Sequence, residues 1–253
     1  MIDDPLFDSQ LHTYPRLYVG EALVSAACVF LDAGQAHYLR NVLRRQEGAY
    51  VRVFNGCDGE WLACIDELGK KKGTLRLEGC LRAQPLAGQD VRLYFSPIRK
   101  QRMDMLIEKA VELGVSSLHP VLMNRSVVRK VNKERVRVQI IEACEQCERL
   151  DVPAFHDMCS FDEMLGGVDL PFYACVERCE QACLLSDFRD MRRAGFLIGP
   201  EGGFHEREVA LLSGHNDITA VSLGASILRA ETAAFACLSW ALFVRRNGEI
   251  STW

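Results

Sequence analysis

The chain has 253 residues, of which 49% are hydrophobic and 25% are charged. This is the composition of a globular protein with one large or two small domains, and it excludes disorder, a collagen-like chain or a coiled coil. The longest apolar run near the C-terminus, residues 233–244, is interrupted by Ser239 and is too short to span a bilayer. The first residues are acidic and carry no basic-then-apolar signal sequence, so we expect a cytoplasmic protein whose eleven cysteines are mostly reduced.

Charge is distributed unevenly around a formal net charge of -4. Residues 91–150 hold 12 basic and 7 acidic side chains, net +5, whereas residues 1–90 carry net -2 and residues 151–253 carry net -7. The net charge of the whole chain argues against a nucleic-acid-binding protein that is basic over its entire surface. The basic middle block fits either a polyanion partner that docks locally or an ordinary solvated helix face.

The first part of the chain predicts a small β-rich domain. Residues 49–54 and 59–65 alternate apolar and polar side chains around an Asn55-Gly56 turn, which is a hairpin signature. A further strand is expected at 74–78 after a turn at 70–73. A short helix at 36–44 carries His37, Arg40 and Arg44, and residues 83–90 have the composition of a linker.

After the linker, strands and helices alternate, which predicts a mostly parallel sheet covered on both faces. Ligand sites in such sheets lie at the carboxyl ends of the strands. The predicted strands are 91–95, 118–122, 172–176, 196–199 and 220–224, and the predicted helices are 103–113, 133–149, 205–212 and 230–246.

Two glycine-containing turns follow apolar strands, at 198–204 (IGPEGGF) and 223–232 (LGASILRAET). Glycine lets the backbone approach a ligand closely, and each turn precedes a helix whose first amides lack partners. Neither turn matches the dinucleotide fingerprint or the phosphate loop with its Lys-Ser/Thr. The two turns are therefore either ligand-binding loops, for a ligand that these residues do not identify, or ordinary strand-to-helix turns.

Arg229 stands just before a predicted helix, where the positive end of the helix dipole disfavours a cation. A residue placed against local preference is more often functional. The structural alternative is that Arg229 pairs with Glu201 or Glu231.

The cysteines suggest a metal or redox site, because Cys144 and Cys147 have half of a zinc-site spacing and Cys175, Cys179 and Cys183 recur every four residues. No second CxxC and no closely spaced histidine pair completes such a site. We expect the cysteines to act as small buried apolar residues, and we expect no metal.

Several motifs, taken together and in order, resemble the RsmE family of 16S ribosomal RNA uridine-N3 methyltransferases, members of the SPOUT superfamily. The resemblance covers nearly the whole chain, and its last two motifs, at this spacing, are the most specific. The motifs are Pro15-Arg16-Leu17-Tyr18, residues 37–44, 102–115, 124–128, 142–147 with Val152-Pro153, 198–203 and 223–233.

The resemblance implies an α/β fold: a SPOUT-type parallel sheet with a trefoil knot and helices on both faces at 90–253, after a PUA-like β-barrel for RNA binding at 1–85. It also implies an S-adenosylmethionine pocket made by the knot, a homodimer with the pocket near its interface, and 16S ribosomal RNA of the small subunit as partner, with neither a membrane nor a metal. The cofactor-binding residues it implies are Leu197, Ile198, Gly199, Pro200, Gly203, Ser222, Leu223, Gly224, Ile227 and Leu228. The RNA-binding residues are Arg16, His37, Arg40, Arg44, Arg102 and Arg125.

Uridine N3 is a poor nucleophile while it holds its proton, so transfer needs the proton removed or the developing ring charge stabilised. We expect Arg229 to orient the base or its charge, because a guanidinium is always ionised and offers several donors. Glu201 is expected as the base or as the group that orients Arg229, and Glu231 as a residue that holds the loop. N3 lies on the pairing edge, so the target base must be unpaired or extruded.

The chain departs from many relatives at two places: no glycine stands near Lys100, and Glu148 replaces a small residue. Three other functions remain as alternatives. They are a ribosome-assembly factor that binds RNA without catalysis, a SPOUT methyltransferase acting on another RNA position, and a zinc or thiol-redox protein.

Overall fold

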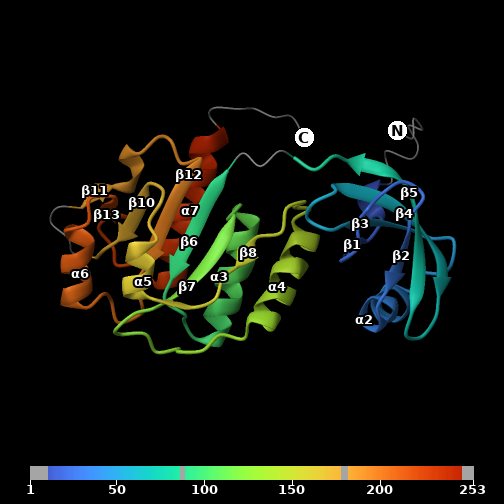
Figure 1. Ribbon diagram of the computed structural model, residues 1–253, viewed down its shortest axis with the longest axis horizontal. Helices are drawn as coiled ribbons and strands as arrows, with labels where there is room; N and C mark the ends of the chain where they lie inside the picture. Colours follow the sequence, from blue (N-terminus) through green and yellow to red (C-terminus); the bar gives the residue numbers. More distant parts are fainter. Residues whose placement is uncertain (1–10, 86–88, 178–181, 247–253) are drawn as a thin grey trace. The chain divides into compact units, whose positions relative to one another are not determined.

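The computed structural model describes residues 11–85, 89–177 and 182–246, with the side chains of the last two excepted (Figure 1). Contacts divide the chain into two compact units. The N-terminal unit comprises residues 1–87 and 144–152, and the C-terminal unit comprises residues 88–143 and 153–253. The boundary at 87/88 lies inside the predicted linker, but residues 144–152 belong to the N-terminal unit rather than to a continuous domain at 90–253.

The N-terminal unit is built on a five-stranded sheet with the strand order β1-β3-β4-β5-β2. The predicted hairpin is present, because β3 and β4 pair antiparallel from Tyr50–Cys64 to Phe54–Glu60. The two outer strands, β1 and β2, were not predicted; they are only three and four residues long, too short for a clear alternation. The strands are β1 Arg16–Tyr18, β2 Cys28–Leu31, β3 Tyr50–Phe54, β4 Glu60–Leu68 and β5 Gly73–Arg82.

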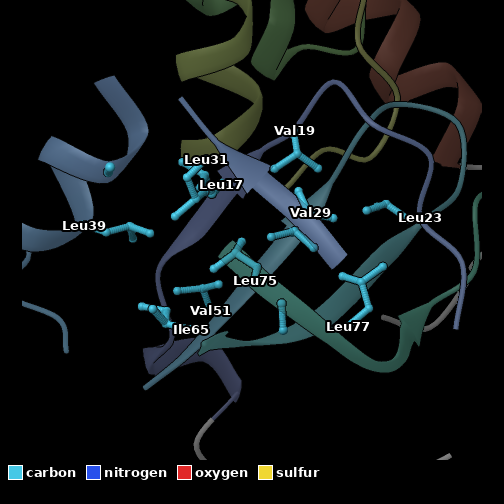
Figure 2. Packing of buried hydrophobic residues seen from close by; sticks show 13 residues of the cluster. Leu17, Val19, Leu23, Val29, Leu31, Leu39, Val51, Ile65, Leu75 and Leu77 are labelled. Atoms are coloured by element: carbon cyan, nitrogen blue, oxygen red, sulfur yellow. The ribbon is translucent and has the colours of Figure 1, made fainter. Parts of the chain in front are cut away.

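Inward-facing side chains from all five strands form one apolar core, shown in Figure 2. Its central members include Leu17, Val29, Val51, Ile65 and Leu75, which are at most 5% exposed. Burial of this alternating set fixes the register of the strands, since a one-residue slip would turn it to solvent.

The predicted helix at 36–44 begins earlier, as α2 Ala33–His37, and continues as a π-helix at Tyr38–Val42. Asp32 caps it: its carboxylate accepts from the Gln35 amide while the Gln35 side chain accepts from the Asp32 amide. Leu39 anchors the π-helix in the core, and Arg44 leaves it in a left-handed conformation with φ of 53°.

A buried ionic cluster joins residues 144–152 to the sheet of the N-terminal unit. Arg16 is 7% exposed, and its Nε donates to Glu60 Oε1 at 2.6 Å. Its Nη1 and Nη2 donate to the carbonyls of Cys144 and Arg149, the latter at 2.6 Å. Each of its three guanidinium nitrogens thus donates to a group inside the protein and the side chain is buried, which argues against the expectation that Arg16 contacts RNA.

Glu148 belongs to the same cluster, since Arg52 Nη2 donates to its Oε1 at 2.7 Å. Its backbone is left-handed, with φ of 58°, so a helix cannot continue through it. The predicted helix 133–149 therefore ends at Gln146, as α4 Lys133–Gln146.

The C-terminal unit contains a parallel sheet with the order β11-β13-β10-β12-β6-β7-β8, and β9 pairs with β7 outside this path. Every described pairing in it is parallel, as the alternation of strands and helices predicts. The strands are β6 Asp90–Phe95, β7 Ser117–Leu122, β8 Ala154–Phe155, β9 Cys159–Ser160, β10 Phe172–Cys175, β11 Cys183–Leu184, β12 Arg193–Ile198 and β13 Ile218–Ser222.

Helices cover both faces of this sheet (Figure 1). On one face, α3 Lys100–Glu112 packs against α7 Ala230–Arg246, which also contacts β6 and β12. On the other, α5 Phe161–Gly166 and α6 Glu206–Ser213 contribute to a core with Tyr94, Phe172 and Leu197. Short 3-10 helices occur at Leu11–Thr13 and Leu185–Asp187.

The register of three strands positions the two glycine turns. Cys175, the last residue of β10, lies between Ile198 of β12 and Val221 of β13. Ile198 is the first residue of the turn at 198–204, and Val221 lies two residues before the turn at 223–232. The turns consequently emerge at the same edge of the sheet, on either side of β10.

Candidate active site

A cavity of about 840 Å³ lies at the carboxyl edge of this sheet and is lined by both glycine turns. Nine of the ten expected cofactor residues line it. Leu197 does not: it is fully buried and packs in the core under α5 and α6, because it faces the opposite side of the sheet from Phe196 and Ile198. The side chain of Leu197 therefore does not face the cavity, and its part in cofactor binding stays a prediction. The nine are Ile198, Gly199, Pro200, Gly203, Ser222, Leu223, Gly224, Ile227 and Leu228.

The first turn uses its glycines for two different reasons. A Cβ on Gly199 would lie 2.8 Å from the ring of Phe204, so this glycine makes room for the protein's own side chain. Gly203 has φ of 70° and would meet nothing within 4 Å, while its amide donates to the Pro200 carbonyl at 2.8 Å. Gly203 therefore shapes the turn and leaves open space in the cavity wall.

The second turn repeats this arrangement. Gly224 has φ of 118° with nothing within 4 Å of a Cβ, and its amide donates to the Ser222 hydroxyl at 3.3 Å. The turn ends where the Arg229 carbonyl accepts from the Ala233 amide at 2.8 Å and α7 begins. Arg229 is exposed and lines the cavity.

The glutamates of the two turns share one arginine, and it is not Arg229. Arg102 of α3 donates from Nη1 to Glu201 Oε1 at 2.7 Å, and its Nε lies 3.6 Å from Oε1 of Glu231. The alternative that Arg229 pairs with Glu201 or Glu231 is therefore wrong, as is the expectation that Glu201 orients Arg229. Within the described part of the chain, Arg229 makes neither an ion pair nor a side-chain hydrogen bond.

Glu231 is 7% exposed, and its Oε2 is buried without a hydrogen-bond partner among the described residues. Arg102 thus joins α3 to both turns through two carboxylates, which occupy part of the guanidinium that was expected to bind RNA.

A buried polar network behind the first turn was not predicted. Glu208 is 5% exposed and accepts from the amides of Asn124 and His205 at 2.7 and 2.8 Å. Ser126 joins the Ser96 hydroxyl at 2.7 Å. The spacing of Glu208 three residues after His205 is a capping signal that could have revealed the first contact. The contacts with Asn124 and Ser96 are non-local.

Arg125, expected to bind RNA, lines the cavity with an exposed side chain whose Nη1 donates to the Gly202 carbonyl at 3.0 Å. It therefore has donors left over for a ligand while it supports the first turn.

The N-terminal unit has its own basic hollow of about 620 Å³, lined by Arg40, Arg44 and Arg45. The Nε of Arg45 is buried and lacks a partner among the described residues, and Arg40 and Arg44 are exposed. His37 is also exposed, and its Nδ1 lies 2.8 Å from the Asn41 side-chain amide. These side chains offer several unused donors to an anion.

The cysteine spacing singled out in the sequence does not assemble a metal site. In the ranges that the structure describes, three or more His, Cys, Asp or Glu side chains do not gather in a metal-binding group. Cys144 is buried, and burial raises the pKa of its thiol to about 12, whereas Cys147 is exposed. Cys179 lies outside the described residues.

None of the described helices is both long and apolar enough to cross a membrane.

Comparison with known proteins identifies the family. A model of the RNA methyltransferase domain matches residues 85–242, and one of the RNA methyltransferase PUA domain matches residues 31–78. The ribosomal RNA small subunit methyltransferase E of Rickettsia conorii is 32% identical, over 89% of this chain and 94% of that protein. This chain belongs to the ribosomal RNA small subunit methyltransferase E (RsmE) family.

The solved structures of similar proteins agree. A putative methyltransferase from Legionella pneumophila, in complex with the bound cofactor SAM, has a TM-score of 0.82 and 28% identity over 90% of this chain and 96% of that one. The RsmE-family enzyme of Neisseria gonorrhoeae, bound to S-adenosyl methionine, has a TM-score of 0.78 and 29% identity over 89% and 95% of the two chains. The expected SPOUT-type α/β fold with a PUA-like N-terminal domain is confirmed.

Proposed function

We propose that this protein transfers a methyl group from S-adenosylmethionine to N3 of a uridine in 16S ribosomal RNA. Membership of the RsmE family and the cofactor-bound structures of its relatives support the reaction class. The catalytic part of the proposal rests on the different contacts of Arg102 and Arg229. Arg102 holds Glu201 and Glu231, and this leaves the Arg229 guanidinium available at the cavity wall.

The cavity fits the cofactor. Its volume of about 840 Å³ lies in the range of small-molecule sites. Gly203 and Gly224, each with positive φ and open space beside it, let the main chain meet a ligand directly. Leu223, Ile227 and Leu228 supply apolar surface. When bound, S-adenosylmethionine supplies an activated methyl group on a sulfonium, so the protein has to bind, position and stabilise charge.

Arg229 supplies the charge stabilisation in this proposal. Removal of the N3 proton leaves negative charge on the uracil ring, and a fixed guanidinium stabilises it through directed donors. Arg229 has no competing carboxylate among the described residues, so its charge is not already neutralised within the protein.

Glu201 is the proposed acceptor of the N3 proton. It lines the cavity, and Arg102 contacts only one of its two oxygens at hydrogen-bond distance. Glu231 is buried under the second turn and is assigned to holding Arg102 in place.

RNA binding is assigned to His37, Arg40 and Arg44 in the N-terminal unit and to Arg125 beside the cavity. Cationic side chains with unused donors suit phosphate contacts. Arg102 is withdrawn from this group because both turns use its guanidinium. The target uridine must reach the cavity with its pairing edge exposed, hence unpaired or flipped out.

The protein is also proposed to form a homodimer. Exposed apolar side chains on the paired helices support it: Phe243 of α7 is 58% exposed and Met105 of α3 is 50% exposed. Ile227, at the cavity wall, is 59% exposed. Analytical ultracentrifugation tests this part of the proposal, which a monomer at micromolar concentration would contradict.

The decisive test of the function is nucleotide mapping. Small subunits and protein-free 16S RNA from a strain lacking this gene are incubated with the enzyme and methyl-labelled cofactor, and the labelled nucleotide is identified by mass spectrometry. The proposal predicts 3-methyluridine at one position. Label at another atom or nucleotide would favour a different SPOUT activity, and RNA binding without label would favour an assembly factor.

A further inference from the structure

Two cysteine thiols meet beside the candidate cofactor cavity. The Sγ atoms of Cys175 and Cys237 lie 3.3 Å apart, although the residues are 62 positions apart in the chain. Cys175 ends β10 and Cys237 belongs to α7 (Figure 1). Phe172 and Ala174 of β10 face the core under α5 and α6, so the alternation of the strand turns Cys175 to the opposite face, which α7 covers.

The pair lies at a structurally sensitive place. Cys175 lines the cavity, and of its register neighbours Ile198 begins the first glycine turn and Val221 lies two residues before the second. Cys237 lies one helical turn after Ala233, which also lines the cavity. A change in the spacing of the two sulfurs would therefore move the end of β10 relative to α7, directly beneath both turns.

The two thiols differ in access. Cys237 is fully buried, and its hydrogen bond with Cys175 together with burial raises its pKa well above the ordinary value. Cys175 is partly exposed and borders the cavity. An oxidant that enters the cavity reaches Cys175 first and finds Cys237 behind it, which is the arrangement of an attacked thiol and a resolving thiol.

We propose that Cys175 and Cys237 form an oxidisable dithiol, and that a hydroperoxide converts it into a disulfide that weakens cofactor binding. The effect on the cofactor rests on the proposed function. With hydrogen peroxide, the Cys175 thiol becomes a sulfenic acid and one water is released as the O–O bond breaks. The Cys237 sulfur then attacks the sulfenic sulfur, a second water leaves, and the S–S bond forms. The two thiols together lose two electrons and two protons.

The expected effect of the disulfide on cofactor binding follows from the distance between the two sulfur atoms. Bond formation shortens the sulfur separation from 3.3 Å to about 2 Å. A shift of about 1 Å in a site can cost on the order of a hundredfold in function. We expect S-adenosylhomocysteine to bind at least about tenfold more weakly to the oxidised protein, with recovery after dithiothreitol. A bound cofactor should in turn slow the oxidation, because it covers Cys175.

The experiment oxidises the full-length protein with a small excess of hydrogen peroxide, blocks remaining thiols and maps disulfides by peptide mass spectrometry. S-adenosylhomocysteine affinity is measured by calorimetry before oxidation, after it, and after reduction. Cys237→Ala cannot form the bridge and should keep its affinity after peroxide. Cys64→Ala, which removes a buried thiol of the N-terminal unit, is the matched control and should respond as the unmodified chain does.

A Cys175–Cys237 bridge, with the affinity loss present in Cys64→Ala and absent in Cys237→Ala, supports the proposal. Absence of that bridge overturns it, as does pairing of Cys175 with Cys179 or Cys183 instead. A bridge that leaves affinity unchanged also overturns it. Failure of the reduced protein to bind S-adenosylhomocysteine would refute the cofactor site itself, and the disulfide map would then still decide the dithiol. If Cys237→Ala does not fold, Cys237→Ser, which keeps the size of the buried side chain, replaces it as the variant that cannot form the bridge.

Discussion

Arg16 in the N-terminal unit and Arg229 in the C-terminal unit both belong to motifs that the sequence singles out, yet the structure gives them opposite surroundings. Arg16 is 7% exposed and donates to Glu60 and to two main-chain carbonyls. Arg229 is exposed at the cavity, and a different arginine, Arg102, takes the nearby glutamates. The difference shows that the role of an arginine depends on which acidic side chains contact it in the fold. A sequence motif does not give this information.

The same contrast predicts which arginine substitutions destabilise the fold and which affect only binding or catalysis. Loss of a guanidinium with buried partners leaves those partners unsatisfied and should destabilise the fold. Loss of a guanidinium without protein partners should leave the fold intact and affect only a bound ligand or transition state.

Replacing Arg16 should have the largest effect on stability. Arg16→Met is expected to lower the free energy of unfolding by about 3–5 kcal/mol, because Glu60 loses its closest buried partner and two carbonyls lose their donor. Urea unfolding measures this. Arg207→Met is the control: its side chain is 72% exposed and lies 3.5 Å from Asp162, so the change should stay below about 0.5 kcal/mol. Equal losses in the two variants would contradict the structural role of Arg16.

Filling the open space at the first turn should remove the cofactor. Gly203→Val is expected to weaken S-adenosylhomocysteine binding by about tenfold or more, because its side chain would occupy the cavity wall. Gly48→Val is matched for backbone strain, since Gly48 has φ of 84° and also has nothing within 4 Å. Calorimetry should show loss only for Gly203→Val. Unchanged affinity in a folded Gly203→Val protein would remove this turn from the site.

Reversing charge in the basic hollow of the N-terminal unit should weaken RNA binding. Arg40→Glu with Arg44→Glu is expected to lower affinity and to reduce the slope of log K against log salt by about 2, one for each lost phosphate contact. Cofactor affinity should not change. Arg76→Glu is the control, because Arg76 already pairs with Asp66 and Glu78. If Arg76→Glu, which reverses one charge instead of two, lowered log K by half as much, the effect would be one of net charge rather than of this hollow.

The smallest effect concerns His119, which stacks between Tyr94 and His156. Burial lowers the pKa of His119 from 6.5 to about 3, so between these values the unfolded chain binds a proton that the folded chain does not. Stability should therefore fall as pH decreases through this window, by roughly 1–2 kcal/mol between pH 7 and pH 5. His119→Gln should flatten this dependence in urea unfolding. An unchanged pH profile would show that His119 takes up its proton equally in the folded and the unfolded chain, which would contradict the lowered pKa.

Local patterns predicted the elements that carry strong periodicity. The β3–β4 hairpin, the parallel sheet of the C-terminal unit and α3 follow from alternation, turn residues and helical spacing. The two- to four-residue strands β1, β2, β8, β9 and β11 lack enough residues for a pattern, and long-range pairing forms them. The end of α4 at Gln146 depends on the left-handed Glu148, a backbone state that no residue type there signals.

The residues of the candidate site also fall into those that the sequence predicted and those that only the folded chain shows. The glycine turns were visible in the sequence because glycine marks unusual backbone, and nine of the ten residues expected there line one cavity. The side chain of Leu197 lies outside this cavity because strand alternation turns it to the other face. The partners of Arg16, Arg102 and Glu208 are non-local side chains or carbonyls, so only the folded chain assigns them.

In the proposed reaction Arg229 acts on the substrate and does not stabilise the fold. Turnover and melting temperature, both measured on Arg229→Ala, distinguish these two roles. Arg229→Ala should lose methyl transfer by roughly a hundredfold or more, as single charge-stabilising donors do, while its melting temperature and cofactor affinity match those of Arg207→Ala. Arg229→Lys should restore little of the rate, because a point charge does not replace a planar fork. Near-normal turnover in folded Arg229→Ala, or a loss of activity that only follows a loss of stability, would contradict the account.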